Sequence, residues 1–184
     1  MKRLDKRQKE KSLAHSSRMG QMRGQINLSF GMLFSIILII VFIVFAFYAI
    51  GKFLDIQKSV KVGQFSESLK ADVDRMWKSS SGSQAVEYSL PSSVESVCFT
   101  DFGESASSGK EKTYDSLRMV HFNEENTFFY PVGSAGGVDS VKINNIDLTE
   151  ITKKENPYCI ESVNEKIKLT IKKDIGSALV VVTR

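Results

Sequence analysis

The clearest pattern in the chain is an apolar run that no charge interrupts. Residues 26–50 are dominated by Ile, Phe, Val and Leu, and no charged residue lies between Arg23 and Lys52. A helix rises about 1.5 Å per residue, so a segment of this length can cross the roughly 30 Å hydrocarbon core of a bilayer. The pattern therefore predicts a transmembrane helix over residues 25–51.

A cleaved secretory signal is the competing interpretation of this run. Such signals have an apolar stretch of only about 7 to 15 residues, followed by a cleavage site with small residues at alternate positions. The run here is longer, and residues 48–51 do not form such a site. A membrane helix that stays on the chain is therefore the better prediction.

Beyond the apolar run, the pattern becomes that of an amphipathic helix over residues 52–78. Apolar residues recur there at steps of three or four among polar ones, which is the helical period. The stripe consists of Phe53, Ile56, Val60, Val62, Phe65, Leu69, Val73 and Met76. We expect it to continue the membrane helix, with Gly63 as a weak point. The stripe should pack on the chain's own following domain, and identical helices in an assembly are a further candidate partner.

After a Ser- and Gly-rich hinge at residues 78–84, the period shortens to two, the period of β-strands. Strands are expected at residues 86–90, 94–99, 117–122, 126–132, 138–143, 158–163, 166–172 and 177–183. Asp174 to Gly176 should form the turn between the last two. The predicted fold class is α+β: a long N-terminal helix followed by a small antiparallel β-sheet or β-sandwich over residues 79–184.

Charge is unevenly distributed along the chain, and this distribution predicts the membrane topology. The first 24 residues hold eight Lys and Arg against two acidic residues, a net +6, so the remainder of this +4 chain carries −2. Basic residues beside a membrane helix favour the cytoplasmic side. We therefore expect a single-pass protein of the cell membrane, in contact with the lipid bilayer, with a cytoplasmic leader and an extracellular domain. Nucleic acid is not an expected partner, because the domain lacks an excess of basic residues.

Two cysteines, Cys98 and Cys159, both lie in predicted strands of the segment placed outside the membrane. Disulfides form and persist in that compartment, so a Cys98 to Cys159 bridge is the natural hypothesis, with two unrelated buried thiols as the alternative.

The chain has few of the residues that catalysis or metal binding requires. His15 lies in the leader and His121 in a predicted strand, so they cannot share a metal site across a membrane. The glycine-rich residues 133–137 lack the Gly-Lys-Ser/Thr ending of a phosphate loop and should form a turn. We expect no catalytic residues, no cofactor and no metal, and an ectoenzyme is the least supported class.

The start of the apolar run, Met22-Arg-Gly-Gln-Ile-Asn-Leu-Ser-Phe30, resembles the class III signal peptide of archaeal type IV pilins and archaellins. The resemblance implies that a prepilin-type peptidase cuts between Gly24 and Gln25 and leaves the apolar helix on the mature protein. It also implies a β-rich head at the cell surface and related subunits as partners through the helix. Ser29 stands where many family members carry Glu, so a minor pilin or a pilin-derived anchor that never polymerises fits as well as a major subunit.

The leading hypothesis is thus a pilin-like structural or interaction protein that displays its head outside the cell. The alternative is an unprocessed, signal-anchored ectodomain that binds a surface ligand or a partner protein. An exposed aromatic cluster at Phe128, Phe129 and Tyr130 would mark such a site, although these residues also fit the core of a strand.

Overall fold

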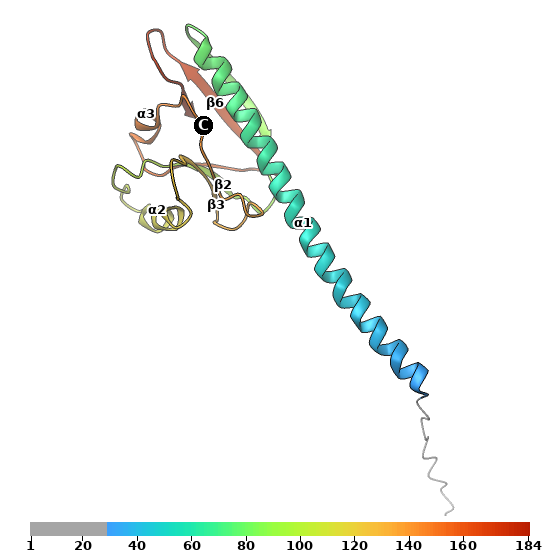
Figure 1. The fold of residues 1–184 in the computed structure, drawn as a ribbon. Coiled ribbons are helices and arrows are strands. Elements are labelled where there is room, and N and C mark those ends of the chain that lie inside the picture. Colours follow the sequence, from blue (N-terminus) through green and yellow to red (C-terminus); the bar gives the residue numbers. More distant parts are fainter. Residues whose placement is uncertain (1–28) are drawn as a thin grey trace, which may run out of the picture. The chain divides into compact units, whose positions relative to one another are not determined.

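The computed structural model describes residues 29–184. Its first element, α1, is one continuous helix of 49 residues, Phe30–Lys78 (Figure 1). The predicted continuation of the apolar helix into the amphipathic one is therefore confirmed, and α1 runs through Gly63 without a break. The chain divides into two compact units after Val44, and the second unit, Phe45–Arg184, contains all the strands.

The first part of α1 is apolar and exposed. Within residues 29–184, α1 is the one helix that is long and apolar enough to cross a membrane, and the apolar window that meets this test has no buried residue. Its large side chains are between 38% and 84% exposed from Phe30 to Ile50. In water such a surface would be strongly unfavourable, whereas lipid or neighbouring apolar helices would satisfy it.

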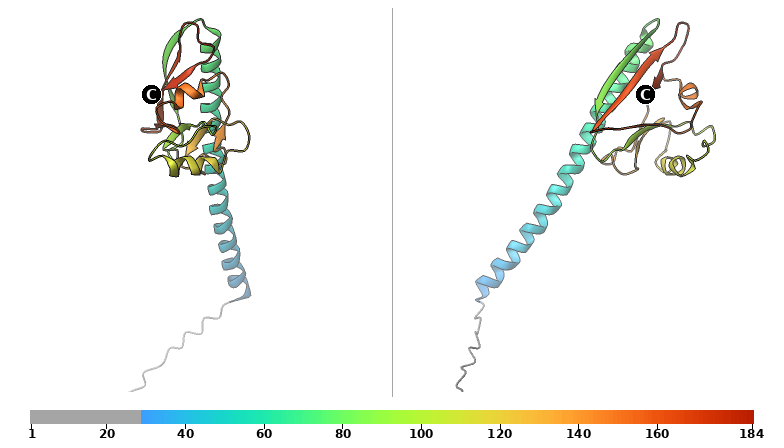
Figure 2. Two further views of the ribbon diagram at one scale, coloured as in Figure 1. Left: turned by 90° about the vertical axis from the view of Figure 1, so that its left-hand side faces the viewer. Right: turned by 180° about the vertical axis from the view of Figure 1, so that it is seen from behind.

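A three-stranded antiparallel sheet lies along the later part of α1 in both views of Figure 2. Its strands are β1 (Gly82–Ser89), β6 (Lys166–Lys173) and β7 (Val181–Thr183), in the order β1-β6-β7. β6 alternates buried Ile167, Leu169 and Ile171 with exposed or half-buried neighbours. This period of two gives the strand one core face and one solvent face, as its sequence predicts.

A second antiparallel sheet has the order β4-β3-β2-β5. Its strands are β2 (Ser96–Phe99), β3 (Thr127–Tyr130), β4 (Ser140–Val141) and β5 (Tyr158–Glu161). Two short helices accompany it, α2 (Glu111–Arg118) and α3 (Leu148–Thr152). The fold is thus α+β with two antiparallel sheets, which confirms the predicted class.

The main core lies where α1 meets both sheets. The ring of Phe65 packs edge-on against Tyr88 of β1, at 5.4 Å between centroids, and against Phe129 of β3, at 5.7 Å. Val62, Leu69 and Val73 lie on the same helical face and are fully buried. Burial of these side chains removes apolar surface from water at about 25 cal/mol per Å², so this face of α1 holds the head together.

Only the later part of the predicted apolar stripe is buried in the head. Burial begins at Val62, whereas Phe53, Ile56 and Val60 remain 53% to 59% exposed. Periodicity alone cannot mark this limit, because the exposed and the buried parts of the stripe share one spacing.

Residues 117–122 do not form the predicted strand. Residues up to Arg118 belong to α2, and the chain then turns. Tyr114 and Leu117, three residues apart, are the buried side chains of this helix, which is the spacing that one helical face requires. The alternation of Leu117, Met119 and His121 was misleading because Met119 is 70% exposed.

The predicted hinge at residues 78–84 is also shorter than expected. Lys78 is the last residue of α1, and β1 begins at Gly82, which pairs with Lys173. Three serines, residues 79–81, therefore make the connection. Several strands are shorter than their predicted ranges as well, β4 and β7 most of all.

The connection between β5 and β6 is a two-residue turn at Asn164 and Glu165. Both residues have positive φ, 53° and 60°, and Val163 forms a bridge with Lys166 across the turn. A tight turn of this handedness fits the right-handed twist of strands. The turn leads from β5 of one sheet directly into β6 of the other.

Candidate interaction groove

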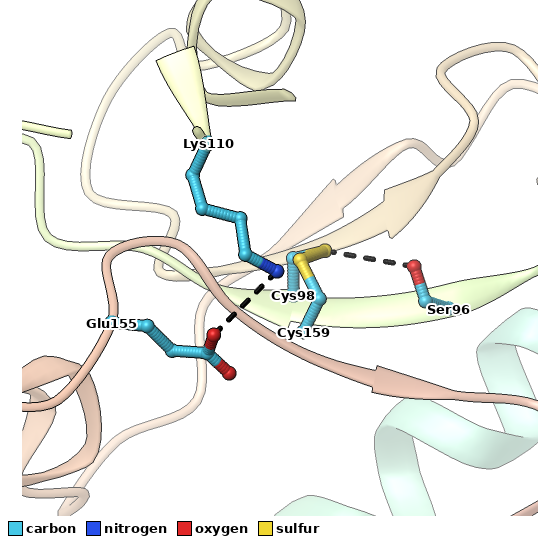
Figure 3. Close-up of a disulfide and its surroundings, with 5 residues drawn as sticks. All are labelled: Ser96, Cys98, Lys110, Glu155 and Cys159. Atoms are coloured by element: carbon cyan, nitrogen blue, oxygen red, sulfur yellow. Dashed lines mark hydrogen bonds and ion pairs between the residues drawn. A yellow bond between two sulfur atoms is a disulfide. The ribbon is translucent and has the colours of Figure 1, made fainter. Parts of the chain in front are cut away.

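Cys98 and Cys159 form a disulfide, which confirms the predicted bridge (Figure 3). They are directly opposite each other on β2 and β5, with their Cα atoms 4.0 Å apart. Cys98 is fully buried and Cys159 is partly exposed. The hydroxyl of Ser96 lies 3.7 Å from the sulfur of Cys98 and can donate to it.

The exposed side of the disulfide borders a broad, open groove of about 1330 Å³. Its lining includes residues 159–163 of β5 and the following turn, Ser96 of β2, Tyr130 of β3, Lys110 and Thr113 at the start of α2, and Lys166 and Lys168 of β6. Side chains alternate along a strand, so Ser96, Cys98, Cys159 and Glu161 share the sheet face turned away from α1. The groove includes part of that face and runs along β5, where five consecutive residues line it, between α2 and β6.

Ion pairs line two sides of this groove. Lys110 and Glu155 are 3.5 Å apart beside the disulfide (Figure 3). On the β6 side, Glu87 pairs with Lys166 and with Lys168. The hydrogen bond from Lys166 holds the pKa of Glu87 below its usual range. These pairs are exposed, so they shape the charge of the groove more than they stabilise the fold.

A smaller hollow of about 640 Å³ lies near the turn before β3. The hydrogen bond from Lys142 lowers the pKa of Glu124, and the backbone N–H of Asn123 lowers that of Glu125. Both carboxylates are therefore charged at neutral pH and already have partners. This hollow offers less to a ligand than the larger groove.

The predicted aromatic cluster is not a surface site. Phe128 and Phe129 are fully buried on opposite faces of β3, and Tyr130 is half-buried at the edge of the groove. Phe128 packs with Phe102, whose ring also contacts His121 in a tilted arrangement, at 4.5 Å between ring centroids. The alternative role of these residues as strand core is therefore the one that the fold adopts.

The glycine-rich residues 133–137 form a turn, as predicted, and this turn also contacts α1. Gly136 has a φ of 68°, and a Cβ there would lie 2.5 Å from the carbonyl oxygen of Asp55 and 2.8 Å from the amide nitrogen of Ser59. Only a residue without a side chain permits this close approach of two backbones.

Gly24 and Gln25, the proposed cleavage pair, lie outside the described residues 29–184. Within that range, no group of three or more His, Cys, Asp or Glu side chains could hold a metal ion.

The groove itself was missed by sequence reasoning, because its parts come from several elements that lie far apart in the chain. The one available signal was the pair Asn164 and Glu165 between two strand patterns, which places β5 and β6 in a hairpin-like connection.

Comparison with known proteins gives no relative. No protein-family model, no curated protein and no solved structure matches this chain.

Proposed function

We propose that this chain is a pilin-like structural or interaction protein, anchored in the cell membrane by α1, that displays its β-rich head outside the cell. The observation that carries the proposal is the division of α1 along its length. Its first part is apolar and exposed on every side, whereas burial in the head begins at Val62. In a helix of this kind, the later part packs in the head, and the first part remains free to contact lipid or related helices.

Two further features support this reading. The residues before α1 carry the basic leader and the class III motif, which fit a prepilin-type peptidase acting between Gly24 and Gln25. The Cys98 to Cys159 disulfide fits an oxidising compartment for the head. The leader then faces the cytoplasm and the head the exterior, as the distribution of Lys and Arg favours.

The second candidate function is that of an unprocessed, signal-anchored ectodomain whose head binds a partner. The observation that favours it is the open groove beside the disulfide, a concave surface with charged residues along its sides. Both candidates place the chain in the membrane and differ in whether the leader is removed. No reaction is assigned to either.

The N-terminus of the protein from its native membrane separates the two. Mass spectrometry should find a mature chain that begins at Gln25 if the pilin-like proposal holds. An intact chain from Met1 favours the unprocessed anchor. Protease added to intact cells should remove the head in either case, and protection of all residues beyond Lys52 would contradict the proposed orientation.

A further inference from the structure

β5 is an edge strand, and its free edge opens into the groove. In the sheet order β4-β3-β2-β5 it has a neighbour, β2, on one side only. Five consecutive residues, 159–163, line the groove. An edge strand presents a row of backbone donors and acceptors to any extended chain that can reach it.

The register identifies the backbone groups that face outward. Ser162 donates its backbone N–H to the carbonyl of Glu95 at 2.7 Å, so this pair is hydrogen-bonded across β2 and β5. Hydrogen-bonded and non-bonded pairs alternate in antiparallel ladders. Cys98 with Cys159 and Ser96 with Glu161 are therefore the non-bonded pairs.

It follows that the backbone N–H and C=O groups of Cys159 and Glu161 point away from β2, toward the groove. Among residues 29–184, no hydrogen bond to these groups is found. They are spaced two residues apart, as the bonding positions of one strand edge must be.

Charge along this edge is polarised. At the Glu161 end, the exposed carboxylates of Glu95 and Glu161 line the groove, and neither forms an ion pair among the described residues. At the Tyr158 end lies Arg184, whose backbone N–H donates to the Tyr158 hydroxyl at 3.0 Å and whose guanidinium is 5.9 Å from the centre of its ring. Lys110 with Glu155, and Lys166 and Lys168 with Glu87, are paired. Of the groove charges that have no ion-pair partner among residues 29–184, those at one end of the edge are thus acidic and the one at the other end is basic.

We propose that the groove binds an extended peptide segment of a partner protein, which adds to β5 as an antiparallel strand. In that direction the N-terminal part of the segment lies beside Glu95 and Glu161 and its C-terminal part beside Arg184. The segment therefore carries a basic residue near its N-terminal end and an acidic residue near its C-terminal end. Backbone hydrogen bonds to Cys159 and Glu161 supply binding, and the two charged ends fix direction.

A second copy of this chain does not fit this site through its own β5. Residues of α2 and β6 line the same groove, so β5 is recessed between them. An identical recessed edge could not reach it, whereas a single extended segment can. The proposal depends neither on cleavage of the leader nor on membrane orientation, so it can fail while the proposed function holds.

The test uses the full chain in detergent micelles and two fluorescent peptides of one composition. The first is Lys-Thr-Val-Thr-Val-Glu, with blocked ends, and the second is the same sequence reversed. We expect the first to bind about tenfold more tightly by fluorescence anisotropy, because an antiparallel strand places both of its charged ends beside opposite charges, whereas the reversed peptide places them beside like charges. Glu161→Lys should remove this preference. Equal binding of the two peptides, or no binding of either at millimolar concentration, overturns the proposal.

A second measurement tests the backbone contacts. The first peptide is N-methylated at alternate amides, in two versions that block opposite edges of its strand. One version should lose binding at least about tenfold and the other should retain it, because only one edge faces β5. If both versions bind like the parent peptide, no strand is added and the proposal is wrong.

Matched variants of the protein complete the test. Glu161→Pro removes one outward N–H, and Glu161→Ala keeps it while losing the same carboxylate. We expect Glu161→Pro to bind the first peptide several-fold more weakly than Glu161→Ala, with the disulfide and the circular dichroism spectrum unchanged. Equal affinities of two folded variants would count against the proposal, and the methylated peptides decide it if Glu161→Pro does not fold.

Discussion

At the scale of single residues, Tyr88 links β1 to α1 through its hydroxyl. The hydroxyl donates to the carboxylate of Asp72 at 2.7 Å, and the side chain is 7% exposed. Burial, together with the hydrogen bond to Asp72, raises the pKa of Tyr88 well above its ordinary value. The folded state therefore favours the neutral phenol.

This shift predicts a pH dependence that Tyr88→Phe removes. Stability from the raised pKa is fully present below the unfolded pKa of about 10 and declines as pH rises above it, because only the unfolded chain then loses the proton. Below about pH 9 the variant should be less stable than the natural chain by about 1.5 kcal/mol. Chemical unfolding at about pH 9 and about pH 11 should show this difference shrinking by about 1.4 kcal/mol per pH unit above pH 10. A difference that stays constant would contradict the assignment.

Within the turn of residues 133–137, we expect substitution to be most destabilising at Gly136. Gly136→Ala combines a positive φ with a Cβ only 2.5 Å from the Asp55 carbonyl. Gly133→Ala is the matched control, since Gly133 also has a positive φ, 86°, but has open space around it.

We expect Gly133→Ala to lower the free energy of unfolding by about 1 kcal/mol and Gly136→Ala by at least about 1 kcal/mol more. Thermal unfolding of both variants checks this. Equal losses of unfolding free energy in the two variants would mean that the turn does not pack against α1.

At the scale of elements, the disulfide joins the central strand β2 to the edge strand β5 of one sheet and so closes a long loop. Cys98 and Cys159 are 61 residues apart, and the closed loop contains α2, β3, β4 and α3. Replacement of both with Ala should lower the free energy of unfolding by about 4 kcal/mol, because the unfolded chain regains the freedom that the closed loop removed. Denaturant unfolding with and without reductant measures this. Reductant should destabilise the natural chain and leave the double variant unaffected.

Some helices and strands could be predicted from local sequence patterns alone, and others could not. β6 alternates cleanly, and α1 has long runs of one period, so both were predicted close to their observed bounds. α2 and α3 were missed because each is about two turns or less, too short for a period to emerge. For α3 a signal existed: Asp147 accepts a hydrogen bond from the N–H of Glu150, which is the N-cap arrangement.

At the scale of the whole molecule, the proposed membrane anchor can be tested on the first part of α1, which is long and apolar enough to cross a membrane. Ile36→Arg/Ile40→Arg/Val44→Arg places three charges in the apolar run, at a cost of about 9 kcal/mol for insertion, enough to offset the apolar residues. The variant should leave the membrane pellet after alkaline extraction.

The matched control is Phe53→Arg/Ile56→Arg/Val60→Arg. These residues belong to the same helix and are similarly exposed, but they lie beyond Lys52. This variant should stay in the pellet. Release of both variants would mean that the inserted segment extends beyond Lys52, and release of neither would contradict the proposed anchor.

The sequence by itself determined the features that depend on periodicity and composition. A long uncharged run fixes a helix that water cannot accommodate, and alternation along β6 fixes a strand with one buried face, because each pattern satisfies a local rule of backbone geometry and burial. The pairing of Cys98 with Cys159 was also within reach, since the chain offers no other cysteine.

Tertiary structure alone decided the rest. Which part of the apolar stripe is buried, which strand stands at a sheet edge and which charges share a groove all depend on residues far apart in the chain. Burial beginning at Val62 reflects where the sheets meet α1, and the free edge of β5 reflects the strand order of the whole sheet. Local spacing carries no information about such long-range neighbours, because the same spacing is satisfied by a buried, a lipid-facing or a partner-facing surface.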